Sequence, residues 1–378
     1  MHTITNQLHW KMPRNSIVGE TMHIGDLQES FLKVTQTAAI ACHPWIGKKD
    51  KYAADDAATK AMRETFNGIE FDGTVVIGEG ERDEAPMLFI GERLGTGNGV
   101  KTDIAVDPLD GTNLAAENKP GAICVIAAAP QGKLFHAPDT YMEKIAVGPK
   151  IGRVVSLTKS VEENLDAISK KTGKTMDRIT VVVLDRPRHQ DIINKVKTKG
   201  ARVKLIAEGD VFGAVMTAIE NSGVDMLMGI GAAPEGVLAA AAIKCAGGYM
   251  EGRFKFRNEN EMERAKKMGM RKEDFEKIYT IDELVKGEEI LFVATGVTEG
   301  DLLKGVVKNK EEYETQSIVF STSDTKPKLI RKNIVVIIIN INLTKDINEK
   351  KETFFNFSCT YLYFKCECSS KRYFSIPT

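Results

Sequence analysis

The segment Asp107-Pro108-Leu109-Asp110-Gly111-Thr112 combines residue types that bind metal ions and phosphate. Two carboxylates three positions apart, across a turn, can converge on a hard cation, which takes oxygen ligands. Gly111 lets the backbone approach a ligand closely, and a helix that begins after it would present free N–H groups to an anion. Thr112 adds a hydroxyl at the same place. Taken alone, the segment has an alternative interpretation as an Asp-Pro turn followed by an Asp N-cap.

Two further acidic sites precede this segment. A β-branched strand leads into the loop from Gly78 to Pro86, which holds four carboxylates within six residues, among them Glu79 and Asp83. Carboxylates this close repel one another unless a cation lies among them. Asp55 stands at or near the start of a predicted helix. The alternatives, for each site by itself, are a solvated acidic loop and an ordinary helix cap.

Three polar segments in the second half of the chain also carry chemistry. Two arginines locked around Pro187, Arg186 and Arg188, suit a phosphate group through bidentate hydrogen bonds. In Glu208-Gly209-Asp210 both acids can accept hydrogen bonds from sugar hydroxyls, and Glu235 follows a glycine-rich loop at a predicted helix start. The alternatives are surface arginines, Asp210 as an N-cap and Glu235 as an acid in the first turn of a helix.

The elements of the first half predict a mixture of helices and a largely antiparallel sheet. Apolar spacing predicts helices over 28–46 and 54–66, and strands over 75–77, 104–106 and 123–127. Pro108 is expected to end the second strand because it has no N–H for a ladder. Pro130-Gln131-Gly132 predicts a hairpin. Gly95 to Gly99 is also interpreted as a hairpin turn, since no strand leads into it as a dinucleotide loop requires.

The second half alternates strand and helix with short links. Strands are expected over 180–184, 203–206 and 225–228, and helices over 189–198, 211–219 and 236–245. Such alternation predicts a parallel sheet with right-handed crossovers and a ligand site at the carboxyl ends of its strands. The fold class is therefore α/β, with an α+β N-terminal half and an α/β C-terminal half.

The chain divides into four expected parts. Residues 1–25 form an N-terminal extension, 26–178 the acidic α+β half and 179–331 the α/β half. Residues 332–378 differ abruptly in composition: they contain no Gly and no Ala, and they hold three of the six cysteines. We expect this tail to be disordered or non-native, and the Cys366-Glu367-Cys368 pair to be incidental rather than metal-binding.

Composition excludes several classes of function. Lys plus Arg equals Asp plus Glu, 52 each, so no basic surface for nucleic acid or an anionic membrane is expected. No apolar run approaches the ~20 residues that span a bilayer, and residues 1–25 lack a secretory or transit pattern. The expected location is the cytoplasm. Cys42, Cys124 and Cys245 are predicted to be reduced thiols in the core.

Together the three acidic sites resemble the magnesium-dependent, lithium-sensitive sugar and inositol phosphatase superfamily. Within it, Gly78–Leu88, Asp185–His189 and Gly229–Gly236 resemble class II, bacterial-type fructose-1,6-bisphosphatases, and the resemblance runs from about Asp26 to about Arg331. It implies a layered sandwich fold. It also implies hydrolysis of the 1-phosphate of fructose 1,6-bisphosphate by a metal-activated water, while the arginines hold the distal 6-phosphate.

The resemblance also implies roles for individual residues. Asp55 and Glu79 would bind one divalent ion, Mn²⁺ or Mg²⁺, and Asp107, Asp110 and Glu235 a second. Asp83 and Thr112 would position the attacking water. The expected substrate contacts are Asp110, Gly111, Thr112, Tyr141, Arg186, Pro187, Arg188, Glu208, Gly209, Asp210 and Ala232. Family members often carry Glu at position 110 and Gly at position 232, so the chain departs from the pattern there.

Three hypotheses of function follow. The first is a fructose-1,6-bisphosphatase, with a sugar bisphosphate as its ligand and a homodimer or homotetramer as its assembly. The second is a phosphatase for sedoheptulose 1,7-bisphosphate or an inositol monophosphate, because paired arginines do not count sugar carbons. The third is a non-catalytic sugar-phosphate sensor, which would require the loss of a metal ligand, and none is missing.

Overall fold

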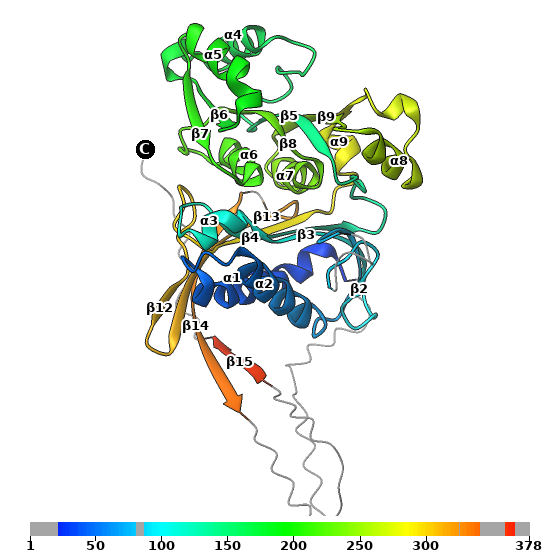
Figure 1. The fold of residues 1–378 in the computed structure, drawn as a ribbon, viewed down its shortest axis with the longest axis vertical. Helices are drawn as coiled ribbons and strands as arrows, with labels where there is room; N and C mark the ends of the chain where they lie inside the picture. The colour runs from blue at the N-terminus through cyan, green and yellow to red at the C-terminus, as the bar shows by residue number, and fades with distance from the viewer. Residues whose placement is uncertain (1–21, 81–86, 325, 341–359, 367–378) are drawn as a thin grey trace, which may run out of the picture.

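The protein folds into alternating layers of helices and sheets in the order helix, sheet, helix, sheet, helix (Figure 1). The computed structural model describes residues 22–80, 87–324, 326–340 and 360–366. Mixed sheets between helical layers confirm the predicted α/β sandwich. No helix in these ranges is long and apolar enough to cross a membrane.

The first sheet has nine strands, and helices α1 (Gln28–Cys42) and α2 (Lys51–Phe66) cover its outer face. Its order is β15-β14-β13-β11-β4-β3-β1-β2, with β12 beside β13. The strands are β1 Asp72–Ile77, β2 Arg93–Leu94, β3 Lys101–Asp110, β4 Ile123–Pro130, β11 Leu291–Gly296, β12 Val307–Asn309, β13 Glu312–Ser321, β14 Lys328–Asn340 and β15 Thr360–Cys366. Strand β4 is apolar throughout because layers cover both of its faces.

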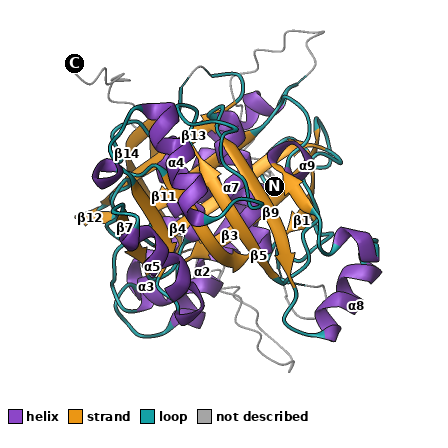
Figure 2. Cartoon of the chain, turned by 90° about the horizontal axis from the view of Figure 1, so that it is seen from above, coloured by secondary structure: helices purple, strands orange, loops and turns teal. Residues whose placement is uncertain are grey.

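The second sheet has six strands in the order β10-β9-β5-β8-β6-β7. They are β5 Tyr141–Val147, β6 Thr180–Leu184, β7 Arg202–Ile206, β8 Met226–Ala232, β9 Tyr249–Lys255 and β10 Ile278–Thr280. Helices α6 (Asp210–Ala218) and α7 (Ala233–Cys245) lie between the two sheets. Helix α7 is buried almost all round, as an apolar helix in a core must be, and lies near the centre of the molecule in Figure 2.

The remaining elements are short or lie at the periphery. Helices α4 and α5 cover the outer face of the second sheet (Figure 1). The helices are α3 Thr112–Ala116, α4 Val161–Thr172, α5 Gln190–Thr198, α8 Glu259–Lys267 and α9 Ile281–Leu284, with 3₁₀ turns η1 Ile24–Leu27, η2 His43–Trp45, η3 Met176–Arg178, η4 Pro187–His189 and η5 Lys272–Asp274.

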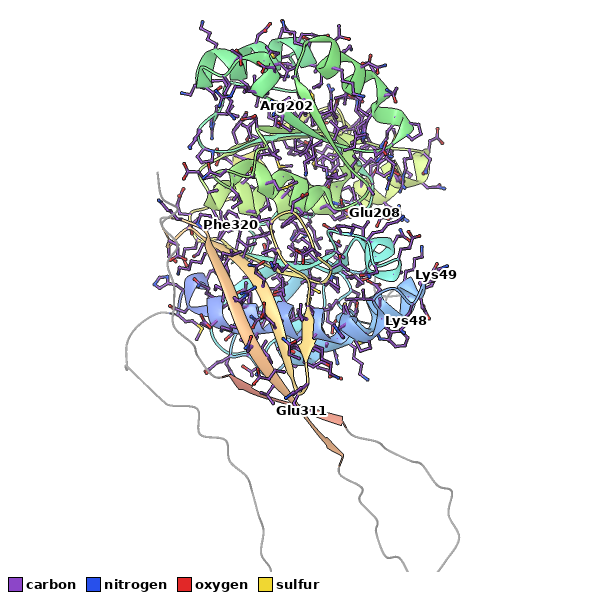
Figure 3. All side chains as sticks on the ribbon, turned by 90° about the vertical axis from the view of Figure 1, so that its left-hand side faces the viewer. Lys48, Lys49, Arg202, Glu208, Glu311 and Phe320 are labelled. Atoms are coloured by element: carbon purple, nitrogen blue, oxygen red, sulfur yellow. The ribbon has the colours of Figure 1, made fainter. Side chains whose placement is uncertain are left out.

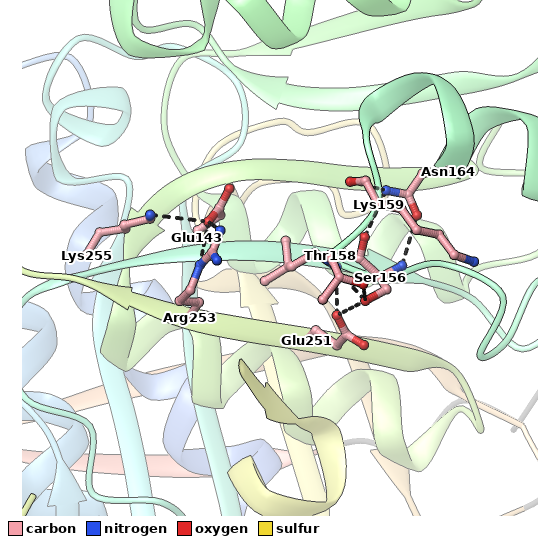
Figure 4. A network of polar contacts seen from close by, with 9 residues as sticks. Glu143, Ser156, Thr158, Lys159, Asn164, Glu251, Arg253 and Lys255 are labelled. Carbon is pink, nitrogen blue, oxygen red and sulfur yellow. Dashed lines mark hydrogen bonds and ion pairs between the residues drawn. The ribbon is translucent and has the colours of Figure 1, made fainter. Parts of the chain in front are cut away.

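A buried acid fastens the loop before α4 to strand β9. Glu251 accepts hydrogen bonds from the Ser156 hydroxyl at 2.9 Å and from the Leu157 N–H at 2.7 Å (Figure 4). The Asn164 amide of α4 bonds back to Ser156. The outer helical layer is therefore tied to the sheet by polar contacts as well as by its apolar face.

Two expected hairpins are wrong. Strands β2 and β3 lie on opposite sides of β1, so the loop from Gly95 to Gly99 crosses the end of β1. A Cβ at Gly95 would lie 2.3 Å from the Phe71 carbonyl oxygen, so this glycine permits close packing of the crossing loop. After the turn at Pro130 the chain leaves the sheet, and Leu134 forms an isolated bridge with Val285.

Strand β3 does not end at Pro108 but continues to Asp110. The pairing of β3 with β4 shifts register between Asp107 and Asp110, so the ladder does not require an N–H from Pro108. The first sheet also contains a parallel pair, β1 with β3. In the second sheet only β7, β6 and β8 pair in parallel, whereas β5, β9 and β10 pair antiparallel. The prediction of a parallel sheet was therefore wrong for half of its strands.

Strands cross the predicted division near residue 178 in both directions. Strand β5 comes before it and lies in the second sheet, whereas β11 to β14 come after it and belong to the first. Strand β14 also runs through the expected boundary at Arg331, and Ile334 is buried. The division into domains stays a prediction. Cys42, Cys124 and Cys245 are free thiols, and the first two are fully buried.

Candidate active site

A cavity of about 640 Å³ opens between the two sheets, where β3, α3, β5 and the β8–α7 junction meet. Most of the residues expected in the site line it, and Pro187 and Asp210 lie directly beside lining residues. Asp83 lies outside the described residues. The lining residues that the sequence predicted are Asp55, Glu79, Asp107, Asp110, Gly111, Thr112, Tyr141, Arg186, Arg188, Glu208, Gly209, Ala232 and Glu235.

The end of β3 delivers two acids and a helix start into this cavity. The register shift at Asp107 and Asp110 turns the strand, and the Leu109 N–H donates to Asp107 Oδ1 at 3.1 Å. Gly111 has φ of +87°, a left-handed conformation that favours glycine, and α3 begins at the next residue, Thr112. Thr112 therefore lines the same cavity as Asp107 and Asp110.

Asp107, Asp110 and Glu235 offer carboxylate oxygens within 4.8 Å of one another. Two come from β3 and the third from the first turn of α7, 125 residues farther along the chain than Asp110. Among the described residues, this is the group of three or more Asp, Glu, His or Cys side chains whose ligand atoms lie close enough together to hold one ion. It coincides with the second metal set that the resemblance implies.

Asp55 and Glu79 form a neighbouring pair of acids. Their carboxyl groups are in hydrogen-bond contact. Burial, together with the charges of Asp55 and Asp107, raises the pKa of Glu79 to about 9. Burial and the charge of Asp55 raise the pKa of Asp107 to about 7. The two acidic groups therefore share one electrostatic environment that disfavours negative charge.

Asp110 and Glu235 have pKa values raised well above the ordinary range, first by burial and then by neighbouring carboxylates. Asp110 Oδ2 is buried and has no hydrogen-bond partner among the residues that the structure describes. Buried acceptors without partners and crowded acids with raised pKa values are the state of a cation site without its ion. The residues present therefore fit a divalent cation with oxygen ligands.

Another part of the cavity lining is cationic and aromatic. The Arg188 guanidinium lies 4.9 Å from the Tyr141 ring centre and donates through Nε and Nη2 to the Ile230 carbonyl oxygen. Arg257 lies 4.7 Å from the centre of the same ring. Arg186 bonds to the Asp185 carbonyl oxygen. Tyr141, Arg186 and Arg188 are thus distant from Asp55 in sequence but line the same cavity as the acids.

Glu208 and Gly209 join the two sides. Glu208 lies at the junction of the upper and lower layers in Figure 3 and accepts a hydrogen bond from the Asn113 amide at 2.7 Å. Gly209, with φ of +80°, is the N-cap of α6, so the interpretation of Asp210 as N-cap was wrong. Asp210 is the first residue of the helix and forms an ion pair with Lys144 at 2.6 Å.

Sequence reasoning missed Lys144, Arg257 and Arg264. Lys144 is 1% exposed on β5, and Arg264 of α8 lines the cavity. A signal was present for Lys144, because it stands at a buried, core-facing position of the alternating segment Tyr141–Val147. Arg257 and Arg264 belong to a polar segment, where arginines on the surface are common and no pattern distinguishes them.

Comparisons with known proteins agree on one family. The family model described as bacterial fructose-1,6-bisphosphatase, glpX-encoded, matches residues 25–334. A protein of Haemophilus influenzae named fructose-1,6-bisphosphatase class 2 is 43% identical over 315 residues, which are 80% of this chain and 93% of that protein.

A second relative comes from Prochlorococcus marinus strain MIT 9301. It is named D-fructose 1,6-bisphosphatase class 2/sedoheptulose 1,7-bisphosphatase. It is also 43% identical, over 312 residues, and the match covers 79% of this chain and 93% of the relative. The match to the family model ends at residue 334, close to the point where the composition changes after Arg331.

Proposed function

Since the chain belongs to the class 2 fructose-1,6-bisphosphatase family, we propose that its cavity hydrolyses the 1-phosphate of fructose 1,6-bisphosphate. Water is the second substrate, and the products are fructose 6-phosphate and inorganic phosphate. The observation that carries this assignment is the convergence of Asp107, Asp110 and Glu235 within 4.8 Å, in a cavity that Arg186 and Arg188 also line.

We propose two divalent ions, Mn²⁺ or Mg²⁺. Asp107, Asp110 and Glu235 would hold one ion, and Asp55 with Glu79 the other. Phosphate monoesters hydrolyse so slowly that acceleration of up to ~10²¹-fold is needed, and a general base alone supplies about 10²–10⁴. Divalent ions supply the rest by neutralising phosphate oxygens and activating water.

The chain's own residues orient the reacting groups. The Thr112 hydroxyl, at the start of α3 beside Asp110, would hold the attacking water together with Asp83. The free N–H groups that follow Gly111 would receive the reacting phosphate. Glu208, Gly209 and Asp210 would accept hydrogen bonds from the sugar hydroxyls. Gly111, Thr112, Glu208 and Gly209 line the cavity, which supports their roles, and the roles of Asp83 and Asp210 follow from the family resemblance.

The distal phosphate would bind at Arg186 and Arg188, beside Tyr141 and Ala232. Arg188 contacts the Ile230 carbonyl oxygen and the Tyr141 ring. These two contacts hold its guanidinium group in place before substrate binds. Binding energy from this distant group orients the 1-phosphate at the acids. A sedoheptulose bisphosphatase is a second candidate, because a relative carries both activities in its name. We also propose a homodimer or homotetramer, which light scattering on the eluting protein would test.

Phosphate release tests this function directly. The purified chain should release phosphate from fructose 1,6-bisphosphate with Mn²⁺ or Mg²⁺ and none with EDTA. Sedoheptulose 1,7-bisphosphate and inositol 1-phosphate serve as the comparison substrates. A higher kcat/KM for the seven-carbon sugar would make the second candidate the correct one. No release from any of the three would contradict a catalytic role and favour a sugar-phosphate sensor.

A further inference from the structure

Lys144 is a fully buried cation inside the acidic cavity wall. Its side chain is 1% exposed, and its ammonium lies 2.6 Å from Asp210 Oδ2 and donates to the Ala232 carbonyl oxygen at 2.8 Å. Ala232 is the N-cap of α7, the helix that carries Glu235. Burying an ammonium costs several kcal/mol unless close partners compensate. The ion pair with Asp210 and the bond to the Ala232 carbonyl oxygen are therefore what keeps this charge buried beside the acids.

The ammonium lies beside a cluster of acids that includes Asp110, Asp210 and Glu235. Asp210 is in contact with Glu235, and the charges of Lys144 and Asp210 both act on Asp110. Asp110 and Asp210 are each 4% exposed, and each keeps one buried oxygen without a hydrogen-bond partner. The cluster therefore has more buried acceptor atoms than the described protein donors satisfy.

The space around the ion pair exists because a glycine stands opposite. A Cβ at Gly231 would lie 1.9 Å from Asp210 Oδ2 and 3.1 Å from the Lys144 ammonium. Any side chain there would displace the pair. The position is thus fitted to a compact cation held between Asp210 and the start of α7.

We propose that the Lys144 ammonium is a resident cation that fills a third cation position, at the corner formed by Asp210 and Glu235. Two positions then remain for divalent ions, so this inference rests on the proposed function. Lys144 acts as a positioning residue: it keeps Asp210 from binding a metal ion and keeps it available to the substrate. Without the ammonium, the same corner offers two carboxylates and the Ala232 carbonyl oxygen to a divalent ion.

Counting bound Mn²⁺ in a variant without the ammonium tests the proposal. Lys144→Met keeps most of the side-chain volume and removes the charge. Isothermal titration of the folded, full-length chain should show one more Mn²⁺ per chain than in the wild type. The double variant Lys144→Met/Asp210→Asn should return to the wild-type number, since it removes both charges. A purely structural lysine would leave the number unchanged in every variant.

Lys174→Met is the matched control. Lys174 pairs with Asp225 at 2.6 Å just before β8, at the end of the strand opposite Ala232. This control should bind the wild-type number of Mn²⁺ ions. An unchanged number in Lys144→Met, or an extra ion that persists in the double variant, would overturn the proposal.

Two further readings keep the test decisive. If Lys144→Met does not fold alone, its cooperative melt should return on addition of Mn²⁺ and not of Na⁺ at equal ionic strength. Failure to return with Mn²⁺ would overturn the proposal. The wild type without Mn²⁺ binding or phosphate release would contradict the proposed function instead, because the role of Lys144 is read from differences between variants.

Discussion

Asp107 interacts with both groups of acids in the cavity. It belongs to the group with Asp110 and Glu235, and its pKa responds to the charge of Asp55. Its Oδ1 accepts the Leu109 N–H, which fixes the carboxylate on the bulged strand. A change at this position therefore affects both proposed ion sites.

Asp107→Asn should abolish phosphate release while the fold is retained. The amide keeps the shape and the Leu109 bond but removes the charge that a divalent ion requires. The loss should exceed roughly 100-fold, the upper end for residues that only support a ligand. Initial rates with excess Mn²⁺, together with a thermal melt, measure both quantities.

Asp103→Asn is the matched control on the same strand. Asp103 is buried and accepts the N–H groups of Lys133 and Leu134 at 2.9 and 3.2 Å, away from the acids. It should lose about 1 kcal/mol of stability, because its hydrogen bonds become neutral, and should keep its rate of phosphate release. An active Asp107→Asn, or an inactive Asp103→Asn, would contradict these roles.

The sequence predicted the acids and the two arginines beside Pro187, but it did not predict the buried cation Lys144. Asp107 and Asp110 lie near the end of β3 and Glu235 in the first turn of α7, and the structure brings their carboxylates together. Lys144 stands inside a buried strand, where a charge has no local explanation. Its partner Asp210 is distant in sequence, so only tertiary structure reveals the pair.

At the scale of elements, local patterns predicted helices and strands, and distant pairing decided the sheets. Helices α2, α5 and α7 lie close to their expected ranges. Pro108 did not end β3, because the shifted pairing with β4 accommodates it. Strand β11 joins the first sheet by pairing with β4, more than 100 residues earlier in the chain, which no local pattern contains.

The turn into α3 should be sensitive to a methyl group. Gly111→Ala places a Cβ at a φ of +87° and 2.9 Å from Leu114 Cδ1. The left-handed conformation costs about 1–2 kcal/mol for a residue other than glycine, and the contact would shift Thr112. We expect a lower free energy of unfolding in urea and slower phosphate release.

Gly97→Ala is the control that distinguishes the cost of backbone strain from an effect on phosphate release. Gly97 has φ of +79°, nothing lies within 4 Å of its added Cβ, and it does not line the cavity. This variant should show a similar loss of stability with an unchanged rate. Equal rates in the two variants would show that the start of α3 does not orient the reaction.

At the scale of the molecule, the alternating layers bring together segments that are distant in sequence. One apolar core lies beneath α1 and α2, and the other fills the space between and around the two sheets. The acids come from α2, the first sheet and α7, and the arginines from the end of β6. Folding therefore assembles repelling carboxylates, so stability should depend on ions and on pH.

Without metal, the protein should become less stable as pH rises. The folded pKa values of Glu79, about 9, and Asp107, about 7, exceed the ordinary values of about 4 in an unfolded chain. Between these limits the folded state holds more protons, so the free energy of unfolding falls from about pH 4 toward pH 9. Melts in EDTA at pH 6 and 8 measure this, and Asp107→Asn should reduce the slope. Higher stability at pH 8 would contradict the account.

The most direct test of the central claim is an anomalous difference map from a crystal soaked in Mn²⁺. The account predicts one peak among Asp107, Asp110 and Glu235 and a second beside Asp55 and Glu79. The absence of a peak among Asp107, Asp110 and Glu235 would contradict it, whether or not the map shows Mn²⁺ at another position.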